Sequence, residues 1–144
     1  MTPRRARPEE ASALAGLIEG AYRAYRDRGV ALPDVSAGVG EAIAAGEVWV
    51  IGEPVLGVLM LRTDPPKAHL MNVAVSPQAR GQGIGGKLIT HAVARARAAG
   101  CAVIALATHR DLSKNISLYQ HLGWVETGRE GMRVMMERRL DPEA

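Results

Sequence analysis

Four glycines stand at positions 81, 83, 85 and 86, between an apolar segment and an amphipathic one. The segment before them, 68–75, has the composition of a strand, and apolar residues recur at helical spacing from Ile84 onward. Glycines in a strand–loop–helix connection let several backbone N–H groups point at one place, where the positive end of the helix also attracts anions. The sequence therefore predicts a phosphate-binding loop over 80–86, and the plain alternative is a glycine-rich turn without a ligand.

The remaining segments predict a mixed α/β domain. Its expected elements are a strand at 2–7, helices at 8–28 and 41–45, strands at 48–51, 55–61 and 68–75, a helix at 84–100, a strand at 101–107, a helix at 113–122 and one or two strands within 124–140. The three middle strands would form an antiparallel meander. The wholly apolar run 101–107 would be covered on both faces and lie parallel to 68–75. Ligands of such a unit gather at the carboxyl ends of the strands.

Bulk composition limits the classes of function. The length of 144 residues suits one globular domain spanning 1–144, and the formal net charge of +3 suits an anionic ligand. No basic stripe with interleaved aromatic residues is present, so we expect no nucleic-acid partner. Cys101 is the only cysteine and is expected to be buried, and no His/Asp/Glu cluster has metal-ligand spacing. No run approaches the ~20 apolar residues of a membrane helix, and no signal peptide is evident, so we expect a cytoplasmic protein without a membrane partner.

Two nucleotide-binding motifs match the glycine loop in residue type and spacing. The dinucleotide fingerprint requires its first glycine directly after the strand and an acid about 20 residues later, but residues 76–80 intervene and no acid follows until Asp111. The P-loop requires a Ser or Thr after its lysine to bind Mg²⁺, and that position is Leu88. Each nucleotide interpretation therefore lacks a group that its chemistry needs.

A third pattern, Arg80-x-x-Gly83-x-Gly85 after a strand that ends at Val75-Ser76-Pro77, closely resembles the acetyl-CoA loop of the GNAT acetyltransferases. A second segment, 115–124, resembles the family's Asn…Leu-Tyr…Leu-Gly-Phe stretch, with Trp124 in the aromatic place. The resemblance covers nearly the whole chain in element order. It implies the GNAT fold, which is a mixed, mostly antiparallel sheet of six to seven strands with a central parallel pair, flanked by about four helices.

The resemblance also implies which residues bind coenzyme A. Arg80 would lie at the turn of the loop, and the pyrophosphate would be cradled by the backbone amides of Gly81, Gln82, Gly83, Ile84, Gly85 and Gly86. The pantetheine arm would pair with the strand at Val73, Ala74 and Val75, in a splay between this strand and 101–107. The amide of Val75 or a near neighbour would polarise the thioester carbonyl. Asn115 would bond the pantetheine arm, with helix capping as the alternative.

Acid and base follow from the same resemblance. Tyr119 matches the tyrosine that donates a proton to the leaving thiolate, and its alternative role is packing of the helix against the sheet. His69 stands where some members, notably histone acetyltransferases, carry a glutamate base. An imidazole can accept a proton from an ammonium at neutral pH. His109 has similar standing, a chain of waters is a further alternative, and His91 and His121 look incidental.

The expected reaction moves the acetyl group of acetyl-CoA to a primary amine, on a small molecule, a peptide or protein N-terminus or a lysine, by direct attack in a ternary complex without a metal. The alternative is a non-catalytic module that senses acyl-CoA. The resemblance implies an acceptor pocket built by residues of about 22–41 together with the last strands, with Tyr22, Tyr25, Arg26 and Asp34 as candidates. The two tyrosines also fit the apolar stripe of their helix. The apolar residues 134–136 would either pair across a homodimer or complete their own sheet.

Overall fold

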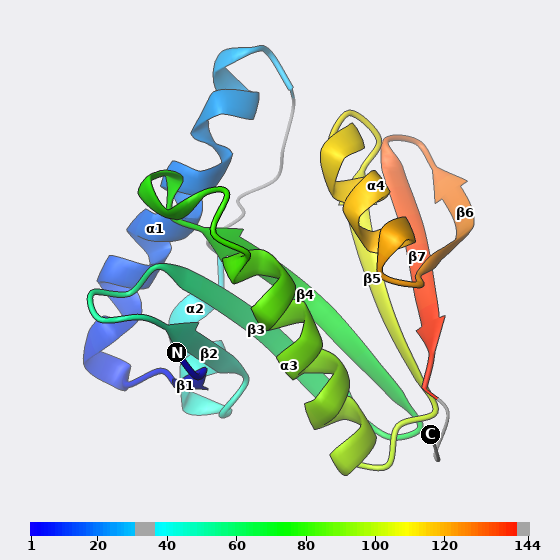
Figure 1. The fold of residues 1–144 in the computed structure, drawn as a ribbon, viewed down its shortest axis with the longest axis horizontal. Coiled ribbons are helices and arrows are strands. Elements are labelled where there is room, and N and C mark those ends of the chain that lie inside the picture. The colour runs from blue at the N-terminus through cyan, green and yellow to red at the C-terminus, as the bar shows by residue number, and fades with distance from the viewer. Residues whose placement is uncertain (31–36, 141–144) are drawn as a thin grey trace. The chain divides into compact units, whose positions relative to one another are not determined.

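The computed structural model describes residues 1–30 and 37–140 (Figure 1). Its elements follow one another in the expected order. They are β1 (Arg4–Arg5), the 3₁₀ helix η1 (Pro8–Glu10), α1 (Ala11–Asp27), α2 (Val39–Ala44), β2 (Val48–Ile51), β3 (Gly57–Asp64), β4 (Lys67–Val75), the 3₁₀ helix η2 (Pro77–Ala79), α3 (Ile84–Ala98), β5 (Val103–His109), α4 (Ser113–His121), β6 (Val125–Glu130) and β7 (Arg133–Arg139).

Seven strands form one mixed sheet in the order β1-β2-β3-β4-β5-β7-β6. β4 and β5 pair in parallel, whereas β1 with β2, β2 with β3, β5 with β7 and β6 with β7 pair antiparallel. Together with the four α-helices of the described residues, this arrangement confirms the predicted GNAT fold.

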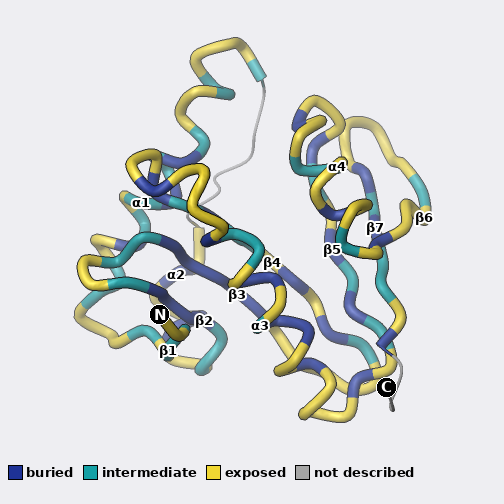
Figure 2. Tube along the Cα trace, in the orientation of Figure 1, coloured by how far each residue is buried: buried dark blue, intermediate teal, exposed yellow. Residues whose placement is uncertain are grey.

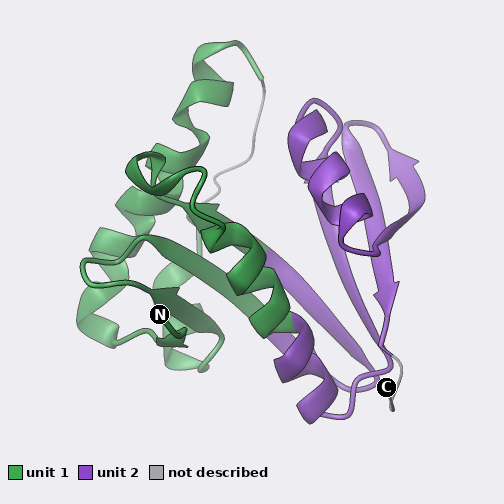
Figure 3. Ribbon diagram, viewed as in Figure 1, with its two compact units in different colours: residues 1–61, 72–92 green, residues 62–71, 93–144 purple. Residues whose placement is uncertain are grey.

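The chain divides into two compact units (Figure 3). Unit 1 comprises residues 1–61 and 72–92, and unit 2 comprises 62–71 and 93–144. β3, β4 and α3 each continue from one unit into the other. That the two units act as a single domain stays a prediction.

The core of unit 1 is aliphatic, as the composition requires. Helix α1 contributes residues at helical spacing, which pack with residues of α2, β2, β3 and β4. These core residues are Leu14, Ile18, Ala21, Val39, Ala42, Ile43, Val48, Val50, Val58, Met60 and Ala74. Figure 2 colours the buried parts of these elements dark blue. Tyr22 packs against this core and is partly buried, so the core role expected of its ring is confirmed.

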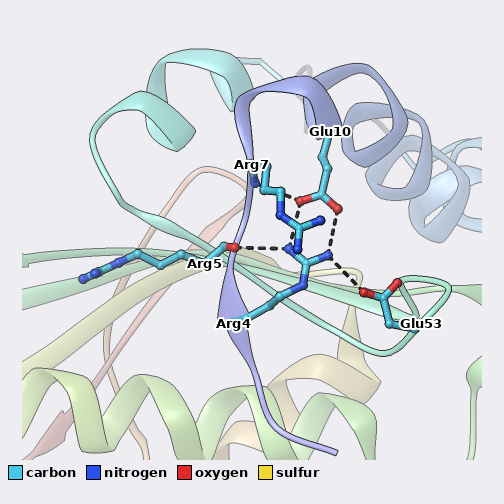
Figure 4. A network of polar contacts seen from close by, with 5 residues as sticks. All are labelled: Arg4, Arg5, Arg7, Glu10 and Glu53. Carbon is cyan, nitrogen blue, oxygen red and sulfur yellow. Dashed lines mark hydrogen bonds and ion pairs between the residues drawn. The ribbon is translucent and has the colours of Figure 1, made fainter.

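An ion-pair network ties β1 to the start of the first helix (Figure 4). The Arg4 guanidinium donates hydrogen bonds of 3.0 and 2.9 Å to the two carboxylate oxygens of Glu10. Glu10 also accepts a 2.8 Å bond from the backbone N–H of Arg7, while Glu53 lies 3.6 Å from Arg4. The hydrogen bond from Arg4, followed by that from Arg7, lowers the pKa of Glu10 to about 2. The network thus stabilises the N-terminus of the helix while Glu10 is ionised.

Unit 2 is built on β5 and β7. The burial of β5 alternates, with Ile104 and Leu106 buried and Ala107 exposed, so the expectation of a strand covered on both faces was wrong. An apolar run is compatible with either pattern, because alanine is small enough to be left on an open face. β7 pairs with β5 on one side and β6 on the other, so residues 134–136 complete their own sheet. The homodimer stays a prediction.

None of the helices in the described part of the chain is long and apolar enough to cross a membrane. Within residues 1–30 and 37–140, no three His, Cys, Asp or Glu side chains are grouped so that they could hold a metal ion. Cys101 is buried, as predicted, and burial raises the pKa of its thiol.

Candidate functional site

The glycine loop of unit 1 connects β4 to α3 through η2. Gly81 and Gly83 have φ angles of +82° and +75°. Residues with a side chain rarely adopt this left-handed conformation, so both positions need glycine for the turn itself. The loop thereby reverses the chain within residues 80–83 and delivers it to the first turn of α3.

The first turn of α3 presents backbone donors that the helix itself does not use. Lys87 N–H donates a 3.1 Å bond to the carbonyl of Gly83, so the helical bonding begins there. The amides of Ile84, Gly85 and Gly86 therefore have no acceptor within the helix. Gly83 has no side chain that could cap them, and the first turn contains no acidic residue. Three amides at the positive end of a 15-residue helix are suited to an anion.

Gly85 and Gly86 are not required by the fold of the chain. Both are helical, and a Cβ at Gly86 would meet nothing within 4 Å, while one at Gly85 would lie 3.7 Å from Val75 Cγ2, an ordinary contact. Glycine within a helix costs about 1 kcal/mol relative to alanine. Neither backbone angle nor packing requires glycine at these two positions, and without side chains there the backbone of the first turn is open to close approach. The turn thus combines amides that the helix does not use with an unobstructed approach to them.

Gly57 of β3 positions the start of α3. A Cβ at this residue would come within 2.8 Å of Ile84 Cγ2 and 2.9 Å of Leu88 Cδ1, distances that real side chains do not adopt. Ile84 and Leu88 are themselves buried. Their packing onto a bare patch of backbone holds the first two turns of α3 close to β3. Leu88, which removed the P-loop interpretation of the sequence, is therefore a core residue.

The end of β4 has one edge directed away from β3. Ser76 N–H donates a 2.8 Å bond to the carbonyl of Leu56, and backbone groups of alternate residues point to alternate sides of a strand. Ala74 therefore faces β3, whereas the N–H and C=O groups of Val73 and Val75 face the other way. β4 pairs with β5 at Lys67, Ala68 and His69. Val73 and Val75 lie beyond these three residues, and their outward groups form a strand edge of the kind that an extended ligand can pair with.

Helix α1 contacts this segment at two points. The Tyr22 hydroxyl lies 3.2 Å from Asn72 Oδ1 and 3.3 Å from the carbonyl oxygen of Val73, to which it donates. Burial raises the pKa of Tyr22 to about 12, so the hydroxyl keeps its proton. The Arg80 guanidinium donates a 2.8 Å bond to the carbonyl of Ala21. Asn72 was not among the residues predicted from the sequence, although a single amide within the apolar run 70–75 was a usable signal.

Asn115 and Tyr119 belong to unit 2. Asn115 is half-buried in the first turn of α4, whose N-cap is Leu112, so Asn115 is not the N-cap residue. Tyr119 is buried, and its ring meets Trp124 edge-on at 5.4 Å between centroids. The Tyr119 ring thus packs against Trp124, whereas its role as general acid stays a prediction.

The two candidate bases also lie in unit 2 and differ in their surroundings. His69 is exposed on β4, opposite Ala105 in the parallel register. His109 is buried at the end of β5, and its Nδ1 accepts a 3.0 Å bond from the backbone N–H of Asp111. That bond leaves the ring proton on Nε2, so neutral His109 offers a donor there rather than a base. The geometry therefore favours His69 of the two.

The acceptor candidates lie at the end of α1. The Tyr25 ring lies 6.4 Å from that of Tyr22 and beneath the Arg28 guanidinium at 4.9 Å. Arg26 pairs with Glu19 at 3.6 Å. Asp34 lies outside the described residues. The structure thus gathers residues 72–86 around one end of β4 in unit 1, and it holds Asn115, Tyr119 and both histidines in unit 2.

Comparisons with known proteins identify the family of this chain. The model of the Acetyltransferase (GNAT) family matches residues 22–124. The uncharacterized N-acetyltransferase YvbK of Bacillus subtilis is 29% identical over 89 residues, which are 60% of this chain and 57% of that relative. This chain therefore aligns with somewhat over half of the relative's length.

Two solved structures share the fold. The PaiA N-acetyltransferase from Thermoplasma acidophilum, in complex with coenzyme A, has a TM-score of 0.83 at 17% identity, covering 95% of this chain and 97% of that one. The ribosomal-protein-S18-alanine N-acetyltransferase from Escherichia coli has a TM-score of 0.74 at 17% identity, covering 96% and 93%. The loop, the sheet with its parallel pair and a family match over most of the chain lead to one conclusion: this chain belongs to the GNAT acetyltransferase family.

Proposed function

We propose that this chain transfers the acetyl group of acetyl-CoA to a primary amine, on a small molecule, a peptide or protein N-terminus or a lysine. The observation that carries the proposal is the first turn of α3, where three backbone amides have no helical acceptor and Gly85 and Gly86 leave the backbone unobstructed by side chains. Membership of an acetyltransferase family favours catalysis over a module that only senses acyl-CoA. A cytoplasmic location stays a prediction.

The proposed binding residues form two groups, one for the pyrophosphate and one for the pantetheine arm of the coenzyme. The amides of residues 81–86 would bind the pyrophosphate, with Arg80 at the turn. Val73, Ala74 and Val75 would pair with the pantetheine arm, which is supported by the two outward-facing residues of β4 beyond its pairing with β5. Asn115 would bond the same arm.

The proposed reaction is direct attack in a ternary complex. His69, or water next to it, would take a proton from the ammonium, and the neutral amine would then attack the thioester carbonyl. The developing oxyanion would accept a bond from an outward amide at Val75 or its neighbour Val73. When the C–S bond breaks, Tyr119 would give its proton to the thiolate, while the second proton of the new amide nitrogen leaves to solvent.

A free-thiol assay with acetyl-CoA and a panel of amines tests this function. The panel should hold small diamines, polyamines, and peptides with either a free N-terminus or a lysine after a blocked one. We expect thiol release that requires both the protein and one class of amine. Tight binding of acetyl-CoA, without amine-dependent release for any member of the panel, would favour the sensing module instead.

A further inference from the structure

Two consecutive residues of α1 hold the two ends of segment 73–80 in unit 1, which contains residues of the proposed coenzyme site. Ala21 accepts the bond from the Arg80 guanidinium, at the end where the glycine loop begins. Tyr22 donates to the carbonyl of Val73, at the end where the outward edge of β4 begins. The segment between Val73 and Arg80 is therefore fixed at both ends to one turn of a helix.

The Arg80 side chain is directed at the helix in this arrangement. Its partner, the carbonyl of Ala21, lies within α1, where it also belongs to the helical bonding pattern. Ala21 itself is buried in the core of unit 1. Although Arg80 is an exposed residue, its guanidinium is held by this bond to the backbone of a buried residue. Arg80 therefore connects the loop to the core of unit 1 through its side chain.

Tyr22 fixes the other end by a similar contact. The ring packs against the core of unit 1, and the protonated hydroxyl reaches the outward carbonyl of Val73 and Asn72 Oδ1. One hydroxyl proton serves two acceptors at nearly equal distance, so the bond limits movement of Val73 without fixing a single partner. The remaining outward groups, the N–H of Val73 and both groups of Val75, stay available for pantetheine.

We propose that Arg80 and Tyr22 are positioning residues for the coenzyme. They hold the glycine loop and the outward edge of β4 at a fixed separation on α1. The loop amides and the outward groups of β4 can then bind the pyrophosphate and the pantetheine arm at the same time. Arg80 acts through this contact and not by pairing with phosphate. The inference rests on the proposed function, because it requires that coenzyme A binds to this segment.

Calorimetric titration with coenzyme A at several salt concentrations separates the two roles of Arg80. We expect Arg80→Ala to weaken binding about 3- to 10-fold, the value of one net hydrogen bond. A direct Arg–phosphate pair is screened by salt, so its loss would flatten the dependence of Kd on salt. The positioning role predicts the same dependence for the Arg80→Ala protein and for Arg97→Ala. Arg97 is an exposed arginine of α3, and its variant controls for the loss of one positive charge.

Tyr22→Phe keeps the ring and removes the hydroxyl. We expect coenzyme A to bind a few-fold more weakly and the KM for acetyl-CoA to rise, while kcat and the melting temperature stay near those of the wild type. The double variant Tyr22→Phe/Arg80→Ala should lose less affinity than the product of the two single losses, since both bonds hold the same segment.

The outcomes distinguish the inference from the function on which it rests. If the wild-type protein does not bind coenzyme A, the proposed function fails. If it binds, the inference is overturned by a flatter salt dependence in Arg80→Ala than in Arg97→Ala. Wild-type affinity in Tyr22→Phe would overturn it as well.

Discussion

The ring of Tyr119 meets that of Trp124 at an interplanar angle of 66° with 5.4 Å between centroids, and both side chains are buried. The backbone N–H of Trp124 also donates a 3.0 Å bond to the carbonyl of Tyr119. Ring packing therefore belongs to the fold of unit 2, and the hydroxyl can be removed without removing the packing.

Tyr119→Phe should keep the fold and slow the reaction. General acid catalysis contributes about 10²- to 10⁴-fold, so we expect kcat to fall by about 100-fold or more. The KM for acetyl-CoA and the melting temperature should stay near those of the wild type, as steady-state kinetics and thermal melting would show. A kcat within two-fold of the wild type would remove Tyr119 from the mechanism and leave it only its packing role.

Gly86→Ala should stabilise the protein and weaken coenzyme binding. Alanine meets nothing within 4 Å at this helical position, and replacing a helical glycine is worth about 1 kcal/mol, or about 2–4 °C in melting temperature. The added methyl group would stand where the pyrophosphate approaches the backbone, so Kd for coenzyme A should rise at least 10-fold.

Gly16→Ala is the matched control for this prediction. Gly16 is an exposed glycine of α1 that also has open space around it, so the control should gain similar stability without any change in Kd. Coenzyme binding that is equally strong in both variants would place the ligand away from the first turn of α3.

Acid should remove the contribution of the Arg4–Glu10 pair. The folded-state pKa of Glu10, about 2, lies below its ordinary value of 4.5, so the pair stabilises the fold above pH 4.5. That stability is lost as the pH falls from 4.5 toward 2. At neutral pH we expect Arg4→Ala to lower the free energy of unfolding by about 0.5–1 kcal/mol.

Denaturant melts as a function of pH test this prediction. The difference between Arg4→Ala and the wild type should shrink through the acid range, be small by pH 2 and vanish below it. Arg129→Ala, which breaks an exposed pair with Glu126, should have little effect at any pH. An Arg4→Ala difference that persists unchanged at pH 2 would show that packing, and not the ion pair, carries the effect.

His69→Gln tests the candidate base. A base must be neutral to accept a proton, so the rate of the wild type should fall on the acid side of its pH profile. The variant should be slower at neutral pH and should lack that acid limb, whereas the same substitution at the exposed His121 should change neither. An acid limb that survives in His69→Gln assigns proton removal to water.

The order of elements and the parallel pair could be predicted from the sequence because both rest on local patterns. Pro8 and two acids mark the first helix, and Gly100 and Gly123, with φ angles of +88° and +96°, end α3 and α4 where glycine was expected to. The glycine loop was equally visible, since its backbone angles require residues without a side chain.

The contacts that position the loop could not be predicted. Arg80 and Ala21 are 59 residues apart, and Tyr22 and Asn72 are 50 apart, so no local pattern indicates either bond. The exposure of Ala107 was missed for a related reason. Apolar composition does not say whether a neighbouring element covers a strand, because that depends on how distant segments pack.

Thermal shift with coenzyme A, acetyl-CoA, ATP and NAD, each at about 100 times the Kd expected for a specific ligand, tests the central claim most directly. A ligand at that concentration stabilises the native state by about 2.7 kcal/mol, or about 5–10 °C in melting temperature. We predict such shifts for coenzyme A and acetyl-CoA and none for ATP or NAD. Stabilisation by ATP or NAD without stabilisation by coenzyme A would contradict the assignment of the glycine loop.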